Sequence, residues 1–412
     1  METYGRQVAL GVIGLGQRGS GLLNNLLSME DVEIVAVCDR NEDKVHRAVE
    51  KVIGAGRPKP AGFLNDKELL DMPNLDGVII AAKWNDHVKI SIEAMKAGVR
   101  PASEVGAAAS LEELWALVET SEQTGVPCML LENCNYGRTE MTLLNMVKQG
   151  LFGELIHCQG GYQHDLRQLM LKDNPNYRIH HYIHRNGENY PTHELGPIAK
   201  YLNINRGNQF LTLTSMSSKA RGLKEWAQQH LGEDHKFAQT DYAQGDIVTT
   251  MIRCAGGETI VLTLDTSLPR PYSRGGRVQG TKGLWMEDNQ SIHIEGRSPA
   301  HAWEPFDNYL EQFEHPLWKE YRAFGVQAGH GGMDYLVLRA FVESVAKQTA
   351  PPIDVYDFAA WRAVSVLSEQ SIAQGSQPVS FPDFTKGRWI NREDAPSSKY
   401  ALDKVDLSLF QS

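Results

Sequence analysis

The side chains best suited to chemistry in this sequence are a phenol and an imidazole three residues apart, Tyr190 and His193. A second phenol, Tyr162, closes an apolar stretch upstream. Histidine, with a reference pKa of about 6.5, exchanges protons near neutral pH. Tyrosine can act as a base when a cation lowers its pKa from about 10, and Arg178 is one candidate for that cation. These residue types favour acid–base chemistry on a polyol substrate.

Each of these residues also has a purely structural interpretation. Tyr162 could fill an apolar sheet face, and His193 could cap a helix that follows a turn at Gly196-Pro197. A group of histidines just upstream could suggest a metal: His180, His181 and His184. Their spacing fits no H-E-x-x-H pattern, so we predict no metal site.

A glycine-rich fingerprint near the N-terminus predicts a bound dinucleotide. The sequence Gly14-Leu15-Gly16-Gln17-Arg18-Gly19 follows an apolar strand pattern and opens a helical one. In such fingerprints the glycines allow a tight turn, a close approach to the pyrophosphate and close helix–strand packing. Asp39 ends the next strand pattern, where an acid receives the ribose hydroxyls. Because a carboxylate repels a 2′-phosphate, NAD is favoured over NADP, although the neighbouring Arg40 leaves room for the phosphorylated form.

Three further polar clusters follow strand-like segments. They are Trp84-Asn85-Asp86-His87, Glu104-Val105 and Glu132-Asn133. The carboxyl ends of parallel strands form the edge where open α/β sheets bind ligands, so these clusters are candidate cofactor contacts. Asn85 could instead cap a helix, and His87 could be a histidine satisfied within the first turn.

Apolar periodicity over the first third of the chain predicts an α/β domain. Strands are expected over 7–13, 32–37, 77–82 and 127–131, and helices after Arg18 and over 41–52, 86–97 and 111–121, with a loop over 54–63. Strands that alternate with helices indicate a parallel sheet with crossover helices. We therefore expect a Rossmann dinucleotide-binding domain over residues 1–134.

The pattern changes after residue 135. An amphipathic helix over 138–149 is followed by longer strands without regular helices between them, over 154–164, 210–216, 246–254 and 259–266, and then by helices over 332–348 and 356–373. Long loops are expected over 167–189 and 269–277. We predict an α+β domain over 135–412, built on an open, mostly antiparallel sheet.

Bulk composition excludes several classes of protein. The 412 residues carry a net charge of −10 with a pI near 5.8, which argues against a nucleic-acid partner and favours a small molecule. No apolar run reaches the roughly 18–20 residues of a membrane span. No basic segment followed by an apolar one suggests a secretory signal, so a cytoplasmic location is expected. The five cysteines are scattered, which indicates free thiols in a reducing compartment.

The first half of the chain resembles the Gfo/Idh/MocA oxidoreductases. The resemblance rests on the fingerprint, Asp39, the helix start at His87 and the Ala97-Gly98 turn before Glu104. The dehydrogenases of that family carry Glu-Lys-Pro where this chain has Glu104-Val105-Gly106. Their lysine holds substrate and transfers a proton, so its absence disfavours a simple dehydrogenase.

Nearly the whole chain, from about Leu10 to Trp389, is similar to family 109 of the glycoside hydrolases. The similar stretches are 132–137, 160–167, 177–178, 185–193, 203–207, 269–276 and 329–334. One departure is Pro101, in a segment where the family usually has Gly-Lys-His-Val before its Glu-Val, and a proline removes a strand donor there.

This resemblance implies site residues and an activity, an NAD-dependent α-N-acetylgalactosaminidase. NAD would be held by Gly14, Gly16, Gln17, Arg18, Gly19, Asp39, Trp84, Asn85, Asp86, His87, Glu104, Val105, Asn133 and Tyr190. The sugar would be bound by Tyr162, Arg178, Tyr190, Pro191, Thr192, His193 and Tyr272.

Glycoside hydrolysis usually needs two carboxylates that flank the bond, and the sequence offers only scattered ones, Asp165, Glu188 and Glu194. NAD offers another route, in which oxidation of the C3 hydroxyl acidifies the C2 proton. Removal of that proton expels the C1 substituent, water adds, and re-reduction restores the sugar and the cofactor. His193 is the candidate base for the C3 hydroxyl and Tyr162 for C2–H, although the two roles could be exchanged.

Two alternatives belong to other classes of protein. An NAD-dependent sugar dehydrogenase would form NADH in proportion to the sugar oxidised, and a non-catalytic sugar or dinucleotide sensor would bind without turnover. The first lacks its lysine at Val105, and the second would not need Tyr162 and His193. The substrate is expected to be a small carbohydrate or glycoconjugate, and the open sheet could pair subunits into a homo-oligomer.

Overall fold

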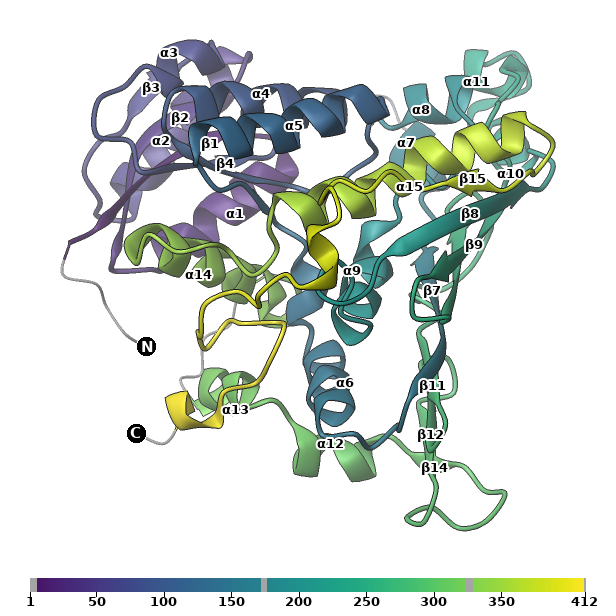
Figure 1. The fold of residues 1–412 in the computed structure, drawn as a ribbon. Coiled ribbons are helices and arrows are strands. Elements are labelled where there is room, and N and C mark those ends of the chain that lie inside the picture. Colours follow the sequence, from purple (N-terminus) through teal and green to yellow (C-terminus); the bar gives the residue numbers. More distant parts are fainter. Residues whose placement is uncertain (1–5, 172–175, 324–328, 411–412) are drawn as a thin grey trace. The chain divides into compact units, whose positions relative to one another are not determined.

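The computed structural model describes residues 6–171, 176–323 and 329–410, which form two compact units (Figure 1). The first unit contains the described residues up to Met141 together with those of His315–Ala359 and Glu393–Ser412. The second contains Thr142–Glu314 and Ala360–Arg392, apart from 172–175. Among the described residues, no helix combines the length and apolar character that a membrane crossing requires.

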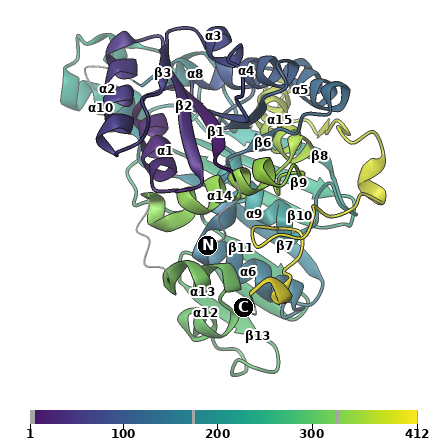
Figure 2. The same ribbon diagram turned by 90° about the vertical axis from the view of Figure 1, so that its left-hand side faces the viewer.

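The first unit is built on a parallel sheet of six strands, which confirms the predicted Rossmann fold. The strands are β1 (Val8–Ile13), β2 (Val32–Cys38), β3 (Ala61–Phe63), β4 (Gly77–Ile80), β5 (Arg100–Ser103) and β6 (Met129–Leu130). Their order is β3-β2-β1-β4-β5-β6, and β3, β2 and β1 lie side by side in Figure 2. The order reverses between β1 and β4, and such switch points are where open α/β sheets bind ligands.

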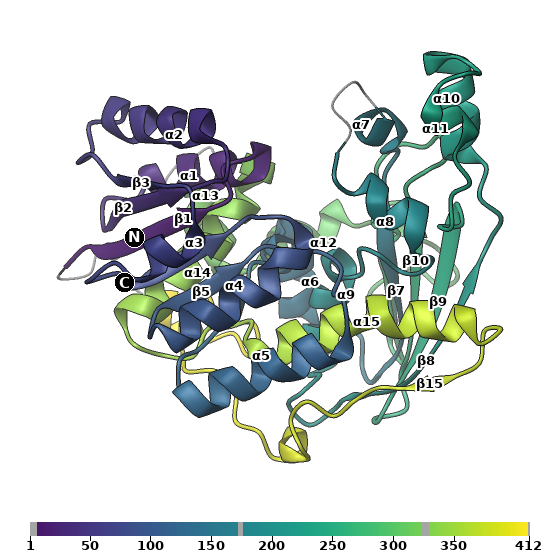
Figure 3. The same ribbon diagram turned by 90° about the horizontal axis from the view of Figure 1, so that it is seen from above.

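Helices cover both faces of this sheet (Figure 3). They include α1 (Gln17–Leu27), α2 (Glu42–Gly54), α3 (Asp66–Leu70), α4 (Trp84–Lys96) and α5 (Leu111–Thr124). The expected cap at Asn41 is confirmed, since its side chain accepts a hydrogen bond from the Lys44 amide at 3.1 Å. Helix α1 buries Leu22, Leu23 and Leu26, the apolar face that its sequence predicts.

The first unit also includes segments from late in the chain. They include η1 (Asn133–Tyr136), α13 (Pro316–Ala323), η2 (Gly329–Gly332), α14 (Met333–Ala346) and η4 (Leu407–Phe410). Helix α14 packs on α1, β1 and η1, and the Tyr136 hydroxyl donates to the Tyr400 carbonyl at 2.8 Å. These contacts group the chain differently from the expected ranges 1–134 and 135–412, because residues distant in sequence complete the first unit. Helices α6 (Arg138–Lys148) and α15 (Val355–Ala373) cross from one unit to the other.

The second unit is built on a mostly antiparallel sheet of nine strands, as predicted. Its order is β14-β13-β12-β11-β7-β10-β9-β8-β15. The strands are β7 (Leu155–Gln163), β8 (Phe210–Ser217), β9 (Ile247–Cys254), β10 (Thr259–Asp265), β11 (Arg277–Gly280), β12 (Gly283–Met286), β13 (Ser291–Ile294), β14 (Glu304–Pro305) and β15 (Val379–Ser380). Strands β7 and β10 pair in parallel, so their carboxyl ends meet at one edge.

Several sequence expectations for the second unit were wrong. Helices do stand between its strands, and they include α9 (Thr192–Tyr201), α10 (Gly222–Leu231), α11 (Lys236–Gln239) and α12 (Asp307–Phe313). The predicted loop over 167–189 contains α7 (Arg167–Leu171) and α8 (Ile179–His184), while its residues 172–175 lie outside the described residues. Gly196-Pro197 lies inside α9 rather than in a turn. Helices this short leave little periodicity and depend on tertiary packing.

Smaller corrections concern the first unit. The predicted loop over 54–63 ends in β3, and its Gly62 lies so close to α2 that an added Cβ would be 2.8 Å from the Val45 Cγ1. Pro101 lies inside β5, opposite Val78 of β4, although it has no amide to donate. The Glu104 amide beyond it donates to the Ile80 carbonyl at 2.8 Å, so Glu104 still stands at the carboxyl edge of the sheet.

Candidate functional site

The glycine fingerprint forms a turn whose shape fits a dinucleotide. Gly14 has φ +89°, and an added Cβ would lie 2.5 Å from the Ala81 carbonyl. A Cβ on Gly19 would lie 1.8 Å from the Gly14 oxygen, which shows how closely α1 packs on the turn. At Gly16, the N-cap of α1, no heavy atom lies within 4 Å of such a Cβ. Space beside amides at a helix N-terminus is what a pyrophosphate needs, so these residues fit NAD.

Asp39 stands at the end of β2, beside this turn. Its Oδ2 accepts a hydrogen bond from the Leu15 amide at 2.8 Å, and its Oδ1 accepts one from the Asn41 amide at 3.0 Å. The Lys44 Nζ lies 3.7 Å from Oδ2. The carboxylate therefore holds the fingerprint against β2 and stands where an acid receives ribose hydroxyls.

The predicted cluster over residues 84–87 forms the first turn of α4. His87 is 1% exposed, and its Nε2 lies 2.9 Å from the Ala82 carbonyl, so it fixes the first turn of α4 to the segment that follows β4. Trp84 is buried, and an added Cβ on Gly106 would lie 2.2 Å from its ring. The N-cap is Lys83 rather than Asn85, which is exposed. The neighbouring Asp86 lies 3.6 Å from Arg40, and Val105 is buried.

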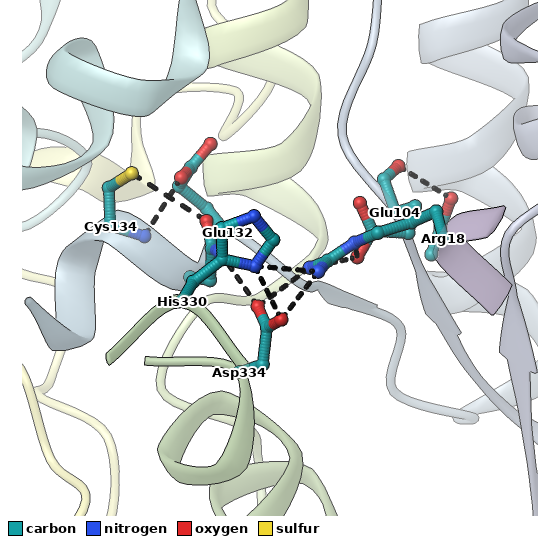
Figure 4. A network of polar contacts seen from close by, with 8 residues as sticks. Arg18, Glu104, Glu132, Cys134, His330 and Asp334 are labelled. Carbon is teal, nitrogen blue, oxygen red and sulfur yellow. Dashed lines mark hydrogen bonds and ion pairs between the residues drawn. The ribbon is translucent and has the colours of Figure 1, made fainter. Parts of the chain in front are cut away.

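Arg18 lies at the centre of a charged network in the first unit (Figure 4). Its guanidinium lies 2.8 Å from the Glu104 Oε1, and it donates to both oxygens of Asp334, at 2.6 and 2.9 Å. The Asn133 amide donates to the same carboxylate at 2.8 Å, and the His330 Nδ1 lies 2.7 Å from its Oδ2. Three predicted cofactor residues, Arg18, Glu104 and Asn133, are thus brought together through Asp334, which the sequence did not single out.

The network fixes the charge of its members. Burial opposes the charge of Arg18, but Glu104 and Asp334 outweigh it and raise the pKa of the guanidinium. Burial likewise opposes the charge of Asp334, yet the hydrogen bonds from His330 and Arg18 hold the pKa of this carboxyl well below its usual range. The hydrogen bond to Asp334 raises the pKa of His330 above its ordinary value.

In the second unit, Tyr162 lies at the end of β7 within a cluster of aromatic rings. Its ring centroid is 4.5 Å from that of Tyr190, 5.5 Å from His193 and 6.3 Å from Tyr272. Its hydroxyl lies 3.2 Å from the Nδ1 of His164, a residue that we did not predict as part of the site. The phenols and the imidazole that the sequence singled out are therefore brought together.

Arg178 supplies a cation to this cluster. Its guanidinium carbon lies 4.9 Å from the centre of the Tyr190 ring. Burial opposes its charge, but the surrounding phenols, Tyr190 first and Tyr162 among them, outweigh this effect and raise the pKa of Arg178. Burial and the charge of Arg178 lower the pKa of His164. The cluster can thus hold a phenolate beside a fixed positive charge.

Helix α9 positions the motif residues over 190–193. Pro191 is its N-cap, and Thr192 and His193 begin its first turn. The helix packs on β7 at Gly160, where an added Cβ would lie 1.7 Å from the Glu194 Cγ. The glycine therefore allows the approach of α9 to the strand that carries Tyr162. On the other side, Gln163 bridges to Ser273, which places the half-exposed Tyr272 beside the cluster.

The three scattered carboxylates each have a separate structural setting. The Asp165 carboxylate accepts two hydrogen bonds from the Arg167 side chain, at 2.9 and 2.7 Å, and the Glu194 carboxylate lies 3.6 Å from the Arg274 guanidinium. Burial raises the pKa of Glu188 to about 8. The acid–base groups that the described residues of the second unit bring together are a phenol, an imidazole and a guanidinium.

A parallel sheet with an anion-binding turn, joined to an open sheet with an acid–base cluster, defines a two-domain protein of the oxidoreductase type. Residues 8–131 match the oxidoreductase family with an NAD-binding Rossmann fold, so the cofactor is NAD. Residues 136–391 match the glycosyl hydrolase 109 C-terminal domain. The chain therefore belongs to glycoside hydrolase family 109.

Relatives along the whole chain agree with this membership. A glycosyl hydrolase family 109 protein of Stenotrophomonas maltophilia is 48% identical, with 94% of this chain and 91% of the relative covered. An alpha-N-acetylgalactosaminidase of Tannerella forsythia is 43% identical, with 93% and 88% covered. Among solved structures, the myo-inositol dehydrogenase of Lactobacillus casei, in complex with NAD(H) and myo-inositol, shares the fold with a TM-score of 0.65 at 15% identity, with 92% and 97% covered.

These findings decide between the functions that the sequence left open. The chain is an enzyme, an NAD-dependent glycosidase, and its substrate is a carbohydrate. The solved dehydrogenase shows the fold alone, because fold by itself does not carry a reaction.

Proposed function

We propose that this glycosidase removes a terminal α-linked N-acetylgalactosamine, or a close relative, from its substrate. The chemistry of the proposal rests chiefly on one observation, the close grouping of Tyr162, Tyr190 and His193 beside Arg178. Two of the relatives, from Tannerella forsythia and Shewanella oneidensis, are named for this activity at 43% and 41% identity.

In the proposed reaction, NAD when bound would supply the reversible oxidation of the sugar C3 hydroxyl, which makes the C2 proton acidic while C3 is a ketone. His193 accepts the proton of the C3 hydroxyl, and Tyr162 accepts the C2 proton while the C1–O bond to the leaving group breaks. Arg178 stabilises the phenolate form of Tyr162. Water then adds its hydroxyl at C1, and its other proton balances the departing oxygen. Tyr162 returns a proton to C2, and His193 returns one to the C3 oxygen as C3 is reduced again. The net change is hydrolysis with no net oxidation.

The binding residues of both sites are part of the proposal. The NAD contacts are Gly14, Gly16, Gln17, Arg18, Gly19, Asp39, Trp84, Asn85, Asp86, His87, Glu104, Val105, Asn133 and Tyr190. The sugar contacts are Tyr162, Arg178, Tyr190, Pro191, Thr192, His193 and Tyr272. Tyr190 is assigned to both groups, as the resemblance to the family implies.

Exchange of the C2 hydrogen tests the role of Tyr162. In D2O we expect the wild-type enzyme to place deuterium at C2 of the released sugar, and the Tyr162→Phe variant to lose at least about a hundredfold of that rate. Tyr242→Phe, which removes a hydroxyl near α11, is the matched control and should exchange like the wild type. A Tyr162→Phe enzyme that exchanges at the wild-type rate would rule out Tyr162 as the C2 base, and the same test on His193→Asn would then assign the step.

We also propose a homo-oligomer formed through the open sheet, and a cytoplasmic location. Met216 and Met251 are 65% and 55% exposed. They lie on neighbouring strands and on one face, since Met251 pairs with Thr214, two residues from Met216. All five cysteines lie in the described part of the chain and are buried as thiols rather than as disulfides, which suits a reducing compartment.

A further inference from the structure

The histidine at the edge of the Arg18 network has an arrangement suited to ligand binding. His330 contacts Asp334 through Nδ1, and its side chain is 60% exposed. Because the carboxylate of Asp334 is ionised and accepts, the hydrogen on the ring stays on Nδ1. The other ring nitrogen, Nε2, takes no part in these contacts, so a proton from water can be added there.

His330 is connected to the predicted cofactor site through Arg18. Its Nδ1 lies 3.3 Å from the Arg18 Nη1, and Arg18 belongs to the first turn of α1. That turn follows Gly16, where the structure leaves space beside the helix N-terminus for the pyrophosphate. The imidazole is therefore linked, through the Arg18 guanidinium, to the helix whose N-terminus faces the pyrophosphate in this fold.

The charges of the network explain why a protonated histidine is useful there. Arg18 is opposed by two carboxylates, Glu104 and Asp334, so the three groups together carry one net negative charge. A pyrophosphate brought to them meets that charge as well as the dipole of α1. Protonation of His330 makes the network neutral, which favours an anionic ligand.

The backbone supports the same interpretation. His330 adopts a left-handed conformation, with φ +50°, next to Gly331 and Gly332 with φ +65° and +103°. Residues other than glycine and asparagine are uncommon there and carry a backbone cost. The cost is easier to explain if the imidazole has a role that a smaller residue could not fill.

We propose that His330 is a further cofactor-binding residue, which takes up a proton at Nε2 as NAD binds and donates it in a hydrogen bond to the pyrophosphate. Asp334 is the positioning residue, since it holds the ring through Nδ1 and holds Arg18 through both oxygens. This inference concerns the NAD site alone and does not depend on the sugar that the enzyme cleaves.

The expected pH dependence of NAD binding follows from the coupling between NAD binding and protonation of His330. The protonated form binds NAD more tightly, so affinity is greatest below the pKa of His330 in the free enzyme and falls as the pH rises through it. The charged groups that face the ring are Asp334, Arg18 and Glu104, from α14, α1 and the end of β5. The NAD dissociation constant should rise by about tenfold between about pH 6 and about pH 9.

Calorimetric titration of the full chain, freed of bound NAD, tests the proposal without any turnover. At about pH 8, titrations with NAD in phosphate and in Tris buffer should differ in enthalpy by the uptake of a fraction of one proton. In His330→Asn, which suits the left-handed backbone, this uptake and the pH dependence should vanish. The control His46→Asn, at an exposed position on α2, should behave like the wild type.

A second variant keeps the test decisive if His330→Asn unfolds. Asp334→Asn removes the charge that raises the pKa of His330, so the pH dependence of NAD binding should move to lower pH. Proton uptake that persists unchanged in a folded His330→Asn protein would overturn the proposal. An Asp334→Asn protein with the wild-type pH profile, or a wild-type enzyme that takes up no proton, would overturn it as well.

Discussion

At the scale of single residues, we expect substitutions at Gly16 and Gly19 of the fingerprint to have different effects, one on NAD binding and the other on stability. We expect Gly16→Ala to fold normally, because nothing lies within 4 Å of the added Cβ, and to weaken NAD binding by at least about tenfold, or about 1.4 kcal/mol. Gly19→Ala should instead lose about 1–3 kcal/mol of stability, since its Cβ would meet the Gly14 oxygen at 1.8 Å. Thermal unfolding and NAD titration of both variants measure the contrast, and equal stability losses would contradict it.

Glu188 gives a prediction about pH at the same scale. Because burial raises its pKa to about 8 from an ordinary value of 4.5, the folded chain keeps a proton that the unfolded chain releases. The stability linked to this proton is complete below about pH 4.5 and is lost as the pH rises towards 8. Glu188→Gln should therefore raise Tm by a few degrees at pH 8 and change it little at pH 5. A Tm gain that is the same at both pH values would refute this account.

The residues of the site were predictable to different degrees. The fingerprint and Asp39 could be predicted because their spacing along the chain indicates their role. The structure places them as that spacing requires. Asp334 could not be found in this way, because its bond to Arg18 spans 316 residues. His164 was missed for another reason, since a lone histidine after a strand gives no sign of which side chain it meets.

At the scale of elements, the contact between α9 and β7 positions the acid–base cluster. Gly160→Ala would place a Cβ 1.7 Å from the Glu194 Cγ, so α9 must move away from β7. We expect kcat to fall by about tenfold or more while NAD affinity stays unchanged, because a small misplacement of catalytic groups is costly. Gly54→Ala, at the open end of α2, serves as the control. If Gly160→Ala keeps wild-type kcat, this packing does not position the site.

The elements that the sequence predicted are the long and strongly patterned ones. Helix α1 and strands β1, β9 and β10 have apolar periods that decide their type. The elements that it missed, such as β3, α7 and α8, are short, and each is held by neighbours that are distant in sequence. Pro101 shows the reverse case, since β5 forms around a residue that by itself argues against a strand.

At the scale of the whole molecule, the exposed face of the open sheet predicts the oligomeric state. The substitution Met251→Asp puts a charge in the middle of that face and should convert an oligomer into a smaller species, because a buried unpaired charge is costly. Light scattering measures the change, and Thr249→Asp on the same strand reports whether the effect extends across the face. A monomeric wild-type enzyme would contradict the proposal.

The measurement that tests the account most directly is the cleavage of p-nitrophenyl α-N-acetylgalactosaminide in D2O with catalytic NAD, with the released sugar analysed by NMR. We expect release of p-nitrophenol, deuterium at C2 of the sugar and no accumulation of NADH. Release without deuterium at C2 would contradict the elimination route and the roles of Tyr162 and His193. NADH formed in proportion to oxidised sugar, with no p-nitrophenol released, would contradict the hydrolytic reaction itself.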